Sequence, residues 1–366
     1  MAGLRALVMP KMGLAMTEGM VAAWRKAPGE PVAAGEEVAD IETSKITAGY
    51  ESPAAGSLRR QVVKPGVMVP VGTLIGVIAD GAADDAEIDA FIAAQHAAFV
   101  PAAEAASAPA PARVATEIGP IQVVEAGPED APPLVLIHGF GGDLNNWLFL
   151  QPLLAARFHT FAIDLPGHGG STKTLPGGNF AALARAVAAF LRARGIGPAH
   201  LVGHSLGGAV ALMLAPESLS LSLISPAGLG PEINMDYIGG FIAARRAREM
   251  QAVLAMLFAD PALIGRDMVE GVLRYKRLDG VAAALQAIAA ANFANGRQNT
   301  SLRATLAAIR VPTLVAWGEA DRIIPAAHAD ALSPSVRVVR FPETGHMAHM
   351  ERAADLARHI IGIADA

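Results

Sequence analysis

The chain has 366 residues, 52% of them hydrophobic, and a formal net charge of −5. These values exclude a disordered chain and a strongly basic nucleic-acid-binding protein. No cysteine is present, so disulfides, zinc–thiolate sites and cysteine nucleophiles are excluded, and we expect no metal site. No apolar run reaches the ~18 residues that span a bilayer, and the N-terminus does not resemble a signal peptide. We therefore expect a cytoplasmic protein with no membrane segment, and the length favours two domains at roughly 100–200 residues each.

Residues 1–80 contain an internal repeat with a spacing of 37 residues. Similar residues pair at this spacing: Gly19 with Gly56, Val32 with Val69, Gly35 with Gly72, and Ile41 with Ile78. Each half alternates apolar and polar residues in short runs separated by Pro-Gly and Gly turns, which is typical of β-strands. Two similar halves predict a small all-β domain, a flattened barrel or sandwich with a pseudo-two-fold axis.

Lys45 lies in the sequence Glu-Thr-Ser-Lys-Ile, at the point where the two halves join. A lone lysine in a turn is usually an exposed side chain, but here Gly35 precedes it and Gly56 follows it in the pattern of a known domain. Residues 1–80 resemble the lipoyl domains of 2-oxoacid dehydrogenase acyltransferases. The related biotinyl domains usually carry Met-Lys-Met at this place, so Ser-Lys-Ile favours lipoate. The resemblance implies lipoate attached covalently to Lys45, a group carrier that brings a dithiol to a chain without cysteine.

Residues 81–113 connect this domain to the rest of the chain. Asp84 or Asp85 can cap a short helix whose apolar residues have helical spacing, as the sequence around Ile88 and Phe91 indicates. The alternating Ala and Pro of residues 101–113 predict an extended, semi-rigid spacer of about 3 Å per residue. Such a spacer suits a domain that moves between partners, although a passive linker has the same composition.

Residues 114–366 alternate apolar strands with helical patterns. The apolar runs lie in segments 132–139, 158–167, 199–208, 221–228, 311–321 and 336–346. Continuous apolar runs between helices predict a parallel sheet covered on both faces, as in an α/β fold.

Ser205 lies in Gly-His-Ser-Leu-Gly, directly after one of these strands and before a helix of small residues. This strand–turn–helix context is that of a nucleophile elbow. Asp321 and His346 each follow a later strand, and the order Ser205, Asp321, His346 is the order of α/β-hydrolase triads. Residues 114–366 thus resemble the α/β-hydrolase family, which implies these three catalytic roles.

The sequence His-Gly-Phe-Gly-Gly (138–142) follows the first core strand. Within the same resemblance, the backbone amides of Phe140 and Leu206 are expected to form the oxyanion hole. Four nearby residues are better interpreted as structural: His204, His138, His349 and Asp164. We interpret His204 as a packed flank of the elbow and His138 as a loop anchor.

His349 competes with His346 for the role of base, but it is expected to lie within the following helix. Asp164 also follows a strand, yet it precedes Ser205 in the chain, so a role in bracing its loop is favoured.

Residues 229–300 are rich in Ala, Met and Arg with helical spacing, which predicts a helical cap. Arg245, Arg246 and Arg248 could bind an anionic ligand such as the phosphates of coenzyme A. The alternative, which we favour, is an exposed helix face with Arg245 and Glu249 as an i,i+4 pair.

The two halves together resemble the acyltransferase components of bacterial acetoin dehydrogenase complexes. This resemblance implies transfer of an acetyl group from a lipoyl thioester on Lys45 to coenzyme A through an acylated Ser205. It also implies three protein partners: a thiamine-diphosphate-dependent component that cleaves acetoin, a flavin-dependent dihydrolipoamide dehydrogenase, and an enzyme that attaches lipoate. Neither nucleic acid nor a membrane is expected as a partner, and homo-oligomerisation stays open.

Two other functions are compatible with the same motifs. One is an ester or thioester hydrolase that carries a lipoyl domain, since its triad would be the same. The other is a lipoyl carrier or scaffold with an idle hydrolase fold, against which the complete set Ser205, Asp321 and His346 argues. The pocket residues do not fix the acyl group.

Overall fold

A computed structural model describes residues 3–10, 18–42, 47–81, 83–98, 110–175, 177–294 and 296–366. The chain divides into two compact units, Met1–Ala108 and Pro109–Ala366, and each is described by itself.

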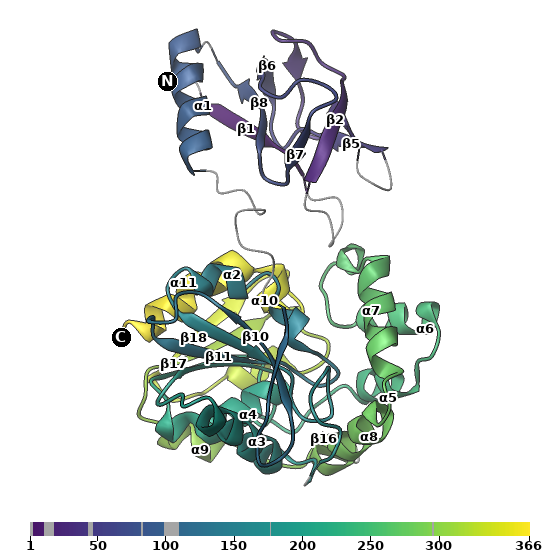
Figure 1. Ribbon diagram of the computed structural model, residues 1–366, viewed down its shortest axis with the longest axis vertical. Coiled ribbons are helices and arrows are strands. Elements are labelled where there is room, and N and C mark those ends of the chain that lie inside the picture. Colours follow the sequence, from purple (N-terminus) through teal and green to yellow (C-terminus); the bar gives the residue numbers. More distant parts are fainter. Residues whose placement is uncertain are drawn as a thin grey trace. The chain divides into compact units, whose positions relative to one another are not determined.

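The described part of the first unit consists of two four-stranded sheets followed by a helix (Figure 1). The strands are β1 (Leu4–Val8), β2 (Glu18–Trp24), β3 (Pro31–Val32), β4 (Glu37–Glu42), β5 (Thr47–Glu51), β6 (Gly56–Gln61), β7 (Met68–Pro70) and β8 (Leu74–Ala79). One sheet has the order β1-β8-β6-β3 and the other the order β5-β4-β2-β7. Buried apolar side chains from both sheets, among them Leu7, Val21, Ile41, Leu58 and Ile78, form one core.

The strand order repeats between the two sheets. A shift of 37 residues carries β4 onto β8, β2 onto β6 and β3 onto β7, within a residue or two. The equivalent strands occupy equivalent places, because β8 and β6 are the inner strands of one sheet and β4 and β2 those of the other. The predicted all-β domain of two similar halves is therefore confirmed.

Helix α1 (Asp85–Ala98) packs against β8, and its N-terminus is capped as expected. The Glu87 N–H donates to Asp84 Oδ1 over 2.7 Å, and the Asp84 N–H donates to Glu87 Oε2 over 3.2 Å, which is a reciprocal capping box. Ile88 is buried against the end of β8, and Arg60 forms ion pairs with two carboxylates of the helix. The predicted helix is confirmed, and it belongs to the body of the first unit.

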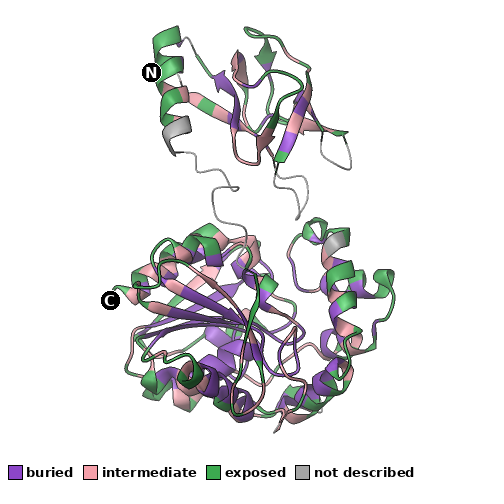
Figure 2. Cartoon of the chain, viewed as in Figure 1, coloured by how far each residue is buried: buried purple, intermediate pink, exposed green. Residues whose placement is uncertain are grey.

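The second unit is built on an eight-stranded sheet of order β18-β17-β14-β13-β11-β12-β10-β9 (Figure 1). Its strands are β9 (Ala112–Val114), β10 (Ile121–Ala126), β11 (Pro133–Ile137), β12 (His159–Ile163), β13 (His200–His204), β14 (Ser220–Ile224), β17 (Thr313–Gly318) and β18 (Val336–Phe341). The six strands from β11 to β18 in this sheet run parallel, and each lies in a segment that the sequence predicted, except that β14 begins one residue earlier, at Ser220. Figure 2 shows most of their length as buried.

The sequence did not predict strands β9 and β10, which are antiparallel to their neighbours at one edge of the sheet. They lack the continuous apolar run that marks the inner strands, because β10 buries only alternate residues at its start. Strand β9 begins at Ala112, two residues before the boundary at 114 that the composition suggested. The edge of the sheet therefore extends into the predicted linker.

Helices cover both faces of this sheet. Helices α3, α4 and α9 lie on one face and α2, α10 and α11 on the other (Figure 1). Their bounds are α2 (Gln151–Ala155), α3 (Phe180–Ala193), α4 (Leu206–Leu214), α9 (Arg303–Ala308), α10 (Ala348–Glu351) and α11 (Ala353–Ala364). This is the predicted α/β-hydrolase architecture.

The segment between β14 and β17 forms the helical cap. Its elements are α5 (Met235–Ala243), α6 (Ala247–Leu254), α7 (Arg266–Lys276), α8 (Val281–Asn292) and the short pair β15 (Phe293–Ala294) and β16 (Arg297–Gln298). They gather at one side of the sheet (Figure 1). Of the helices that the structure describes, none combines the length and the apolar character needed to cross a membrane.

Candidate active site

Ser205 occupies a sharp turn between β13 and α4. Its φ of 52° and ψ of −116° lie in a region that non-glycine residues rarely adopt, so the turn is strained. Neighbouring backbone groups hold it there. The Ser205 N–H donates to the Ile224 carbonyl over 2.9 Å, and the Ala227 N–H donates to the Ser205 carbonyl over 3.0 Å. The serine is therefore fixed by β14 and by the loop that follows this strand.

The two glycines of the elbow allow α4 to approach the sheet closely. A Cβ atom on Gly203 would overlap the carbonyl of Gly207, and one on Gly207 would overlap the carbonyls of Ile137 and His138. Backbone atoms cannot move aside as a flexible side chain can. The sequence pattern Gly-x-Ser-x-Gly is thus required by packing at this place.

Asp321 and His346 form a buried pair at the ends of β17 and β18. His346 Nδ1 lies 2.7 Å from Asp321 Oδ2, and the two side chains are 2% and 0% exposed. The Trp317 Nε1–H donates to Oδ2 of Asp321, and the N–H groups of Ile323 and Ile324 donate to Oδ1. Because the carboxylate is held by these donors, it can fix His346 with Nδ1 protonated and Nε2 free to accept a proton.

His204 links this pair to the elbow. Its Nε2–H donates to the His346 carbonyl over 3.0 Å, and the two rings lie 4.6 Å apart. Burial is the main cause that lowers the pKa of His204 well below its ordinary value, so the ring is neutral. The interpretation of His204 as a packed flank is confirmed.

His349 lies in helix α10, as expected, and is fully buried. Neither of its ring nitrogens has a hydrogen-bond partner among the described residues. It packs against the rings of Trp147 and His204 instead, and burial lowers its pKa to about 3. His346, which is paired with Asp321, is therefore the better candidate for the base.

The loop after β11 presents a free backbone amide. The Gly139 carbonyl accepts hydrogen bonds from the Gly142 N–H and from the ring of His138, at 3.1 and 2.8 Å. The Phe140 N–H belongs to the same peptide group and has no acceptor in the part of the chain that the structure describes. A Cβ atom on Gly139 would lie 3.1 Å from the Cβ of Ser205, so the loop packs directly on the elbow.

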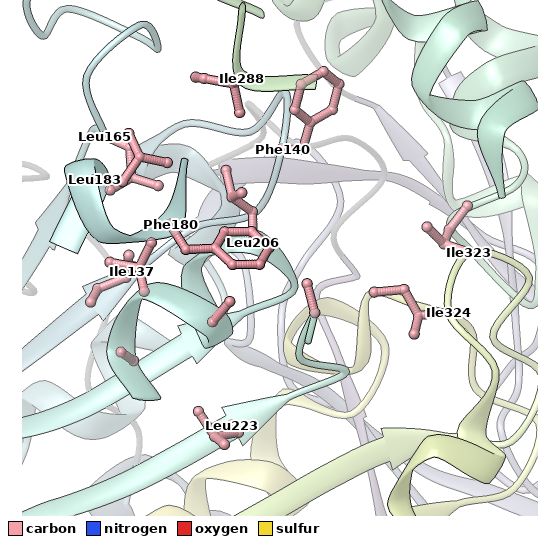
Figure 3. Packing of buried hydrophobic residues seen from close by; sticks show 14 of the residues in the cluster. Ile137, Phe140, Leu165, Phe180, Leu183, Leu206, Leu223, Ile288, Ile323 and Ile324 are labelled. Carbon is pink, nitrogen blue, oxygen red and sulfur yellow. The ribbon is translucent and has the colours of Figure 1, made fainter. Parts of the chain in front are cut away.

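Leu206 supplies a second free amide at the first position of α4, where no intrahelical acceptor exists. Its side chain and that of Phe140 are buried in one apolar cluster with Ile137 and, from the cap, Ile288 (Figure 3). Ser205 is 7% exposed, and its hydroxyl makes no hydrogen bond to a described residue. Hydrogen bonds of catalytic groups often tighten only when substrate binds.

Asp164 and His138 brace the loops after β12 and β11, as the sequence indicated. Asp164 accepts hydrogen bonds from the N–H groups of Leu144 and Gly170, at 2.8 and 2.7 Å. His138 Nε2 accepts from the Leu165 N–H over 3.0 Å. Burial lowers the pKa of His138 to about 4, so the ring stays neutral and keeps this acceptor.

The three cap arginines are exposed and lie around the start of α6. Arg245 donates to the Ile242 carbonyl at the end of α5. The i,i+4 spacing suggested that Glu249 pairs with the Arg245 guanidinium, but it does not. It accepts from the backbone N–H groups of Arg245 and Arg246, because these amides begin helix α6 and have no intrahelical acceptor. This arrangement matches an exposed helix face.

Lys45 falls in residues 43–46, which lie outside the described residues. The described residues on either side are paired, with Glu42 opposite Thr47 at the end of the antiparallel pair β4 and β5. A primary amine between two paired strands fits the amide linkage through which lipoate attaches to a lysine. Within the described ranges, no group of three or more His, Asp or Glu side chains could hold a metal ion.

The second unit thus has a parallel sheet, a strained serine and a buried imidazole–carboxylate pair, which are typical of serine-dependent enzymes of the α/β-hydrolase fold. The family of the alpha/beta hydrolase fold matches residues 132–353, and that of biotin-requiring enzymes, which includes lipoyl domains, matches residues 5–78. Among solved structures, a 2-hydroxy-6-oxo-6-phenylhexa-2,4-dienoate hydrolase from Rhodococcus aligns with a TM-score of 0.62. It is 24% identical, and the alignment covers 70% of this chain and 99% of that one.

Two curated proteins match over both units. The dihydrolipoyllysine-residue acetyltransferase component of the acetoin cleaving system from Pseudomonas putida is 46% identical over 367 residues, covering 99% of this chain and 98% of that protein. Its counterpart from Cupriavidus necator is 43% identical and covers 97% of each. The chain belongs to this family of acetyltransferase components, which combine a lipoyl domain with an α/β-hydrolase fold.

Proposed function

We propose that the chain transfers an acetyl group from a thioester on the lipoyl group of Lys45 to coenzyme A, with Ser205 as the nucleophile. The observation that carries this proposal is the match to two acetyltransferase components along nearly the whole chain. The geometry supports it, because Ser205, the pair of His346 and Asp321, and two free backbone amides lie in loops at the carboxyl ends of β11, β13, β17 and β18. When attached, the lipoyl group supplies a thiol that holds the acyl group as a thioester.

In the first half of the reaction, Ser205 becomes acylated. His346 Nε2 takes the proton of the Ser205 hydroxyl, and the oxygen attacks the thioester carbonyl. Asp321 orients the imidazole and stabilises its positive charge. The N–H groups of Phe140 and Leu206 donate to the carbonyl oxygen as it becomes negative. When the carbon–sulfur bond breaks, the departing sulfur receives the proton from His346.

In the second half, the thiol of coenzyme A replaces the departed one. His346 takes the thiol proton, the sulfur attacks the acyl carbon, and the proton returns to Ser205 as its bond to the acyl group breaks. The same groups therefore serve both halves in opposite order. Transfer to a thiol in preference to water requires that the acyl-serine be shielded from water. The cap, which lies next to the elbow, can exclude water from it.

Membership of an acetoin cleaving system implies other components. We propose a thiamine-diphosphate-dependent component that cleaves acetoin, a dihydrolipoamide dehydrogenase that reoxidises the dithiol, and an enzyme that attaches lipoate to Lys45. Tethering on the same chain raises the local concentration of the acyl donor to roughly millimolar, so its affinity for the site can be low.

The test is the fate of the acyl group of S-acetyl-dihydrolipoamide with coenzyme A present, in wild type and Ser205→Ala. We expect acetyl-coenzyme A from the wild type, and a loss of at least about 10³-fold in the variant. Free acetate as the main product would show a thioester hydrolase. Unchanged transfer in Ser205→Ala would remove Ser205 from the mechanism, and no reaction at all in the lipoylated wild type would favour a scaffold.

A further inference from the structure

Tyr237, on the first turn of cap helix α5, reaches the loop that carries Phe140. Its hydroxyl donates a hydrogen bond to the Phe140 carbonyl over 3.2 Å, and its side chain is buried. Burial raises the pKa of Tyr237, so the hydroxyl keeps its proton and remains a donor at every working pH. No sequence pattern predicts this contact, since residues 140 and 237 lie in different elements.

The opposite side of the same peptide group is also held. The Gly141 N–H donates to Nε2 of His168 over 3.2 Å, while His168 Nδ1 faces the Pro166 carbonyl at 3.2 Å. Burial lowers the pKa of His168 well below its ordinary value, which keeps Nε2 an acceptor. Tyr237 and His168 therefore fix both polar groups of the peptide that follows Phe140.

Helix α5 also packs against this loop through the residue one turn after Tyr237. A Cβ atom on Gly141, whose φ is 73°, would lie 2.5 Å from the ring of Phe241. The rings of Phe140 and Phe241 lie 6.1 Å apart with their planes at 66°. The loop therefore has little room to move toward the cap.

The start of α5 is in turn tied to the loop of Asp321. The Asn234 side chain caps α5 by accepting from the Tyr237 N–H over 3.2 Å, and its Nδ2–H donates to the Arg322 carbonyl over 2.9 Å. The Asn234 N–H donates to the Ile323 carbonyl over 2.9 Å. One helix turn of the cap thus bonds to the acid loop on one side and to the Phe140 loop on the other.

We propose that Tyr237 is a positioning residue that holds the Phe140 amide in the direction of the developing oxyanion. The inference rests on the proposed role of Phe140. Without the hydroxyl, the buried Phe140 carbonyl loses its hydrogen-bond donor. Rotation of that peptide toward another donor then becomes energetically favourable. Rotation displaces the adjacent Phe140 N–H, which must lie about 2.7–3.1 Å from the oxyanion to be effective. The cap is therefore part of the catalytic apparatus as well as its cover.

The test compares Tyr237→Phe with Tyr275→Phe in the full-length lipoylated chain. Both changes remove one hydroxyl from a buried cap tyrosine, but the Tyr275 hydroxyl has no partner among the described residues, so its loss breaks no hydrogen bond. The acylation burst with 4-nitrophenyl acetate measures the formation of acyl-Ser205 whatever the acceptor. A trifluoromethyl ketone that adds to Ser205 measures stabilisation of the oxyanion itself.

We expect Tyr237→Phe to lower the acylation rate constant about 10- to 100-fold, to leave KM nearly unchanged, and to weaken the trifluoromethyl ketone by a similar factor. Tyr275→Phe should match the wild type, and thermal denaturation should show both variants folded. Unchanged acylation and ketone affinity in Tyr237→Phe, or equal losses in the two variants, would overturn the inference. If the wild type shows a burst but produces acetate, the proposed transferase function fails and the effect of Tyr237 is still measured.

Discussion

The two units solve the problem of placing a reactive group in opposite ways. In the first, the function proposed above adds the reactive group to a single lysine, Lys45, which the sequence places between the paired residues Glu42 and Thr47. In the second, Ser205 and the pair of Asp321 and His346 are buried and fixed by hydrogen bonds from several elements. A carrier can therefore depend on one residue, whereas a catalytic site depends on the packing of many.

The largest expected effect is that of Lys45→Arg, which separates the activity of the carrier from that of the catalytic unit. Arginine keeps the positive charge but cannot form the amide that attaches lipoate, so acetoin oxidation by the assembled system should be abolished. Transfer from free S-acetyl-dihydrolipoamide to coenzyme A should remain at the wild-type rate, because the second unit is untouched. Both rates are measured as acetyl-coenzyme A formed. A parallel loss of both activities would contradict the division between carrier and catalyst.

A smaller but still severe effect is expected from packing in the second unit. In Gly207→Ala the new methyl group meets the backbone carbonyls of Ile137 and His138, so α4 must move away from the sheet. We expect a loss of at least about 1–3 kcal/mol in the free energy of unfolding, measured by denaturant titration. The matched control is Gly197→Ala, since a Cβ there meets nothing within 4 Å. Equal midpoints for the two variants would disprove this account of the elbow.

The smallest effect concerns pH. His349 has a pKa of about 3 in the folded chain, because of its burial, against about 6.5 when exposed. Between these values the unfolded state binds more protons, so the stabilising contribution of the neutral ring is present above pH 6.5 and is lost as the pH falls toward 3. Each pKa unit corresponds to about 1.4 kcal/mol.

The change His349→Phe removes this proton binding. Denaturant titrations between pH 7.5 and 5 should therefore show a shallower loss of stability in the variant than in the wild type. Curves that remain parallel over this range would mean that His349 does not stay neutral in the folded chain. The described strands of the first unit contain no histidine, so no comparable slope is expected from its two sheets.

Much of this architecture could be predicted from sequence because its signals are local. The 37-residue repeat, the apolar runs of the parallel strands and the glycines beside Ser205 each reflect a backbone requirement within a short segment. The assignment of Ser205, Asp321 and His346 then rested on their chain order, which resembles that of α/β-hydrolase triads.

What could not be predicted depends on contacts between elements distant in sequence. Nothing near Tyr237 or His168 distinguishes them from other buried rings, and their role appears only when α5 and the loop after β12 meet the loop of Phe140. The Glu249 carboxylate caps α6 because of where that helix begins, which spacing alone could not give. The antiparallel strands β9 and β10 were missed because neither carries the continuous apolar run of the inner parallel strands.

The equivalence of β4 and β8 has a consequence for how the carrier can evolve. After β4 the chain continues into the residues that contain Lys45, and after β8 it continues into α1 and the spacer. The pseudo-symmetry therefore relates the end proposed to carry lipoate to the end that continues into the rest of the chain. Insertions or deletions in the spacer change how far the proposed lipoyl group can reach, but they leave unchanged the surface that a lipoate-attaching enzyme would recognise. The reach of the domain and the group attached to it can therefore be selected independently.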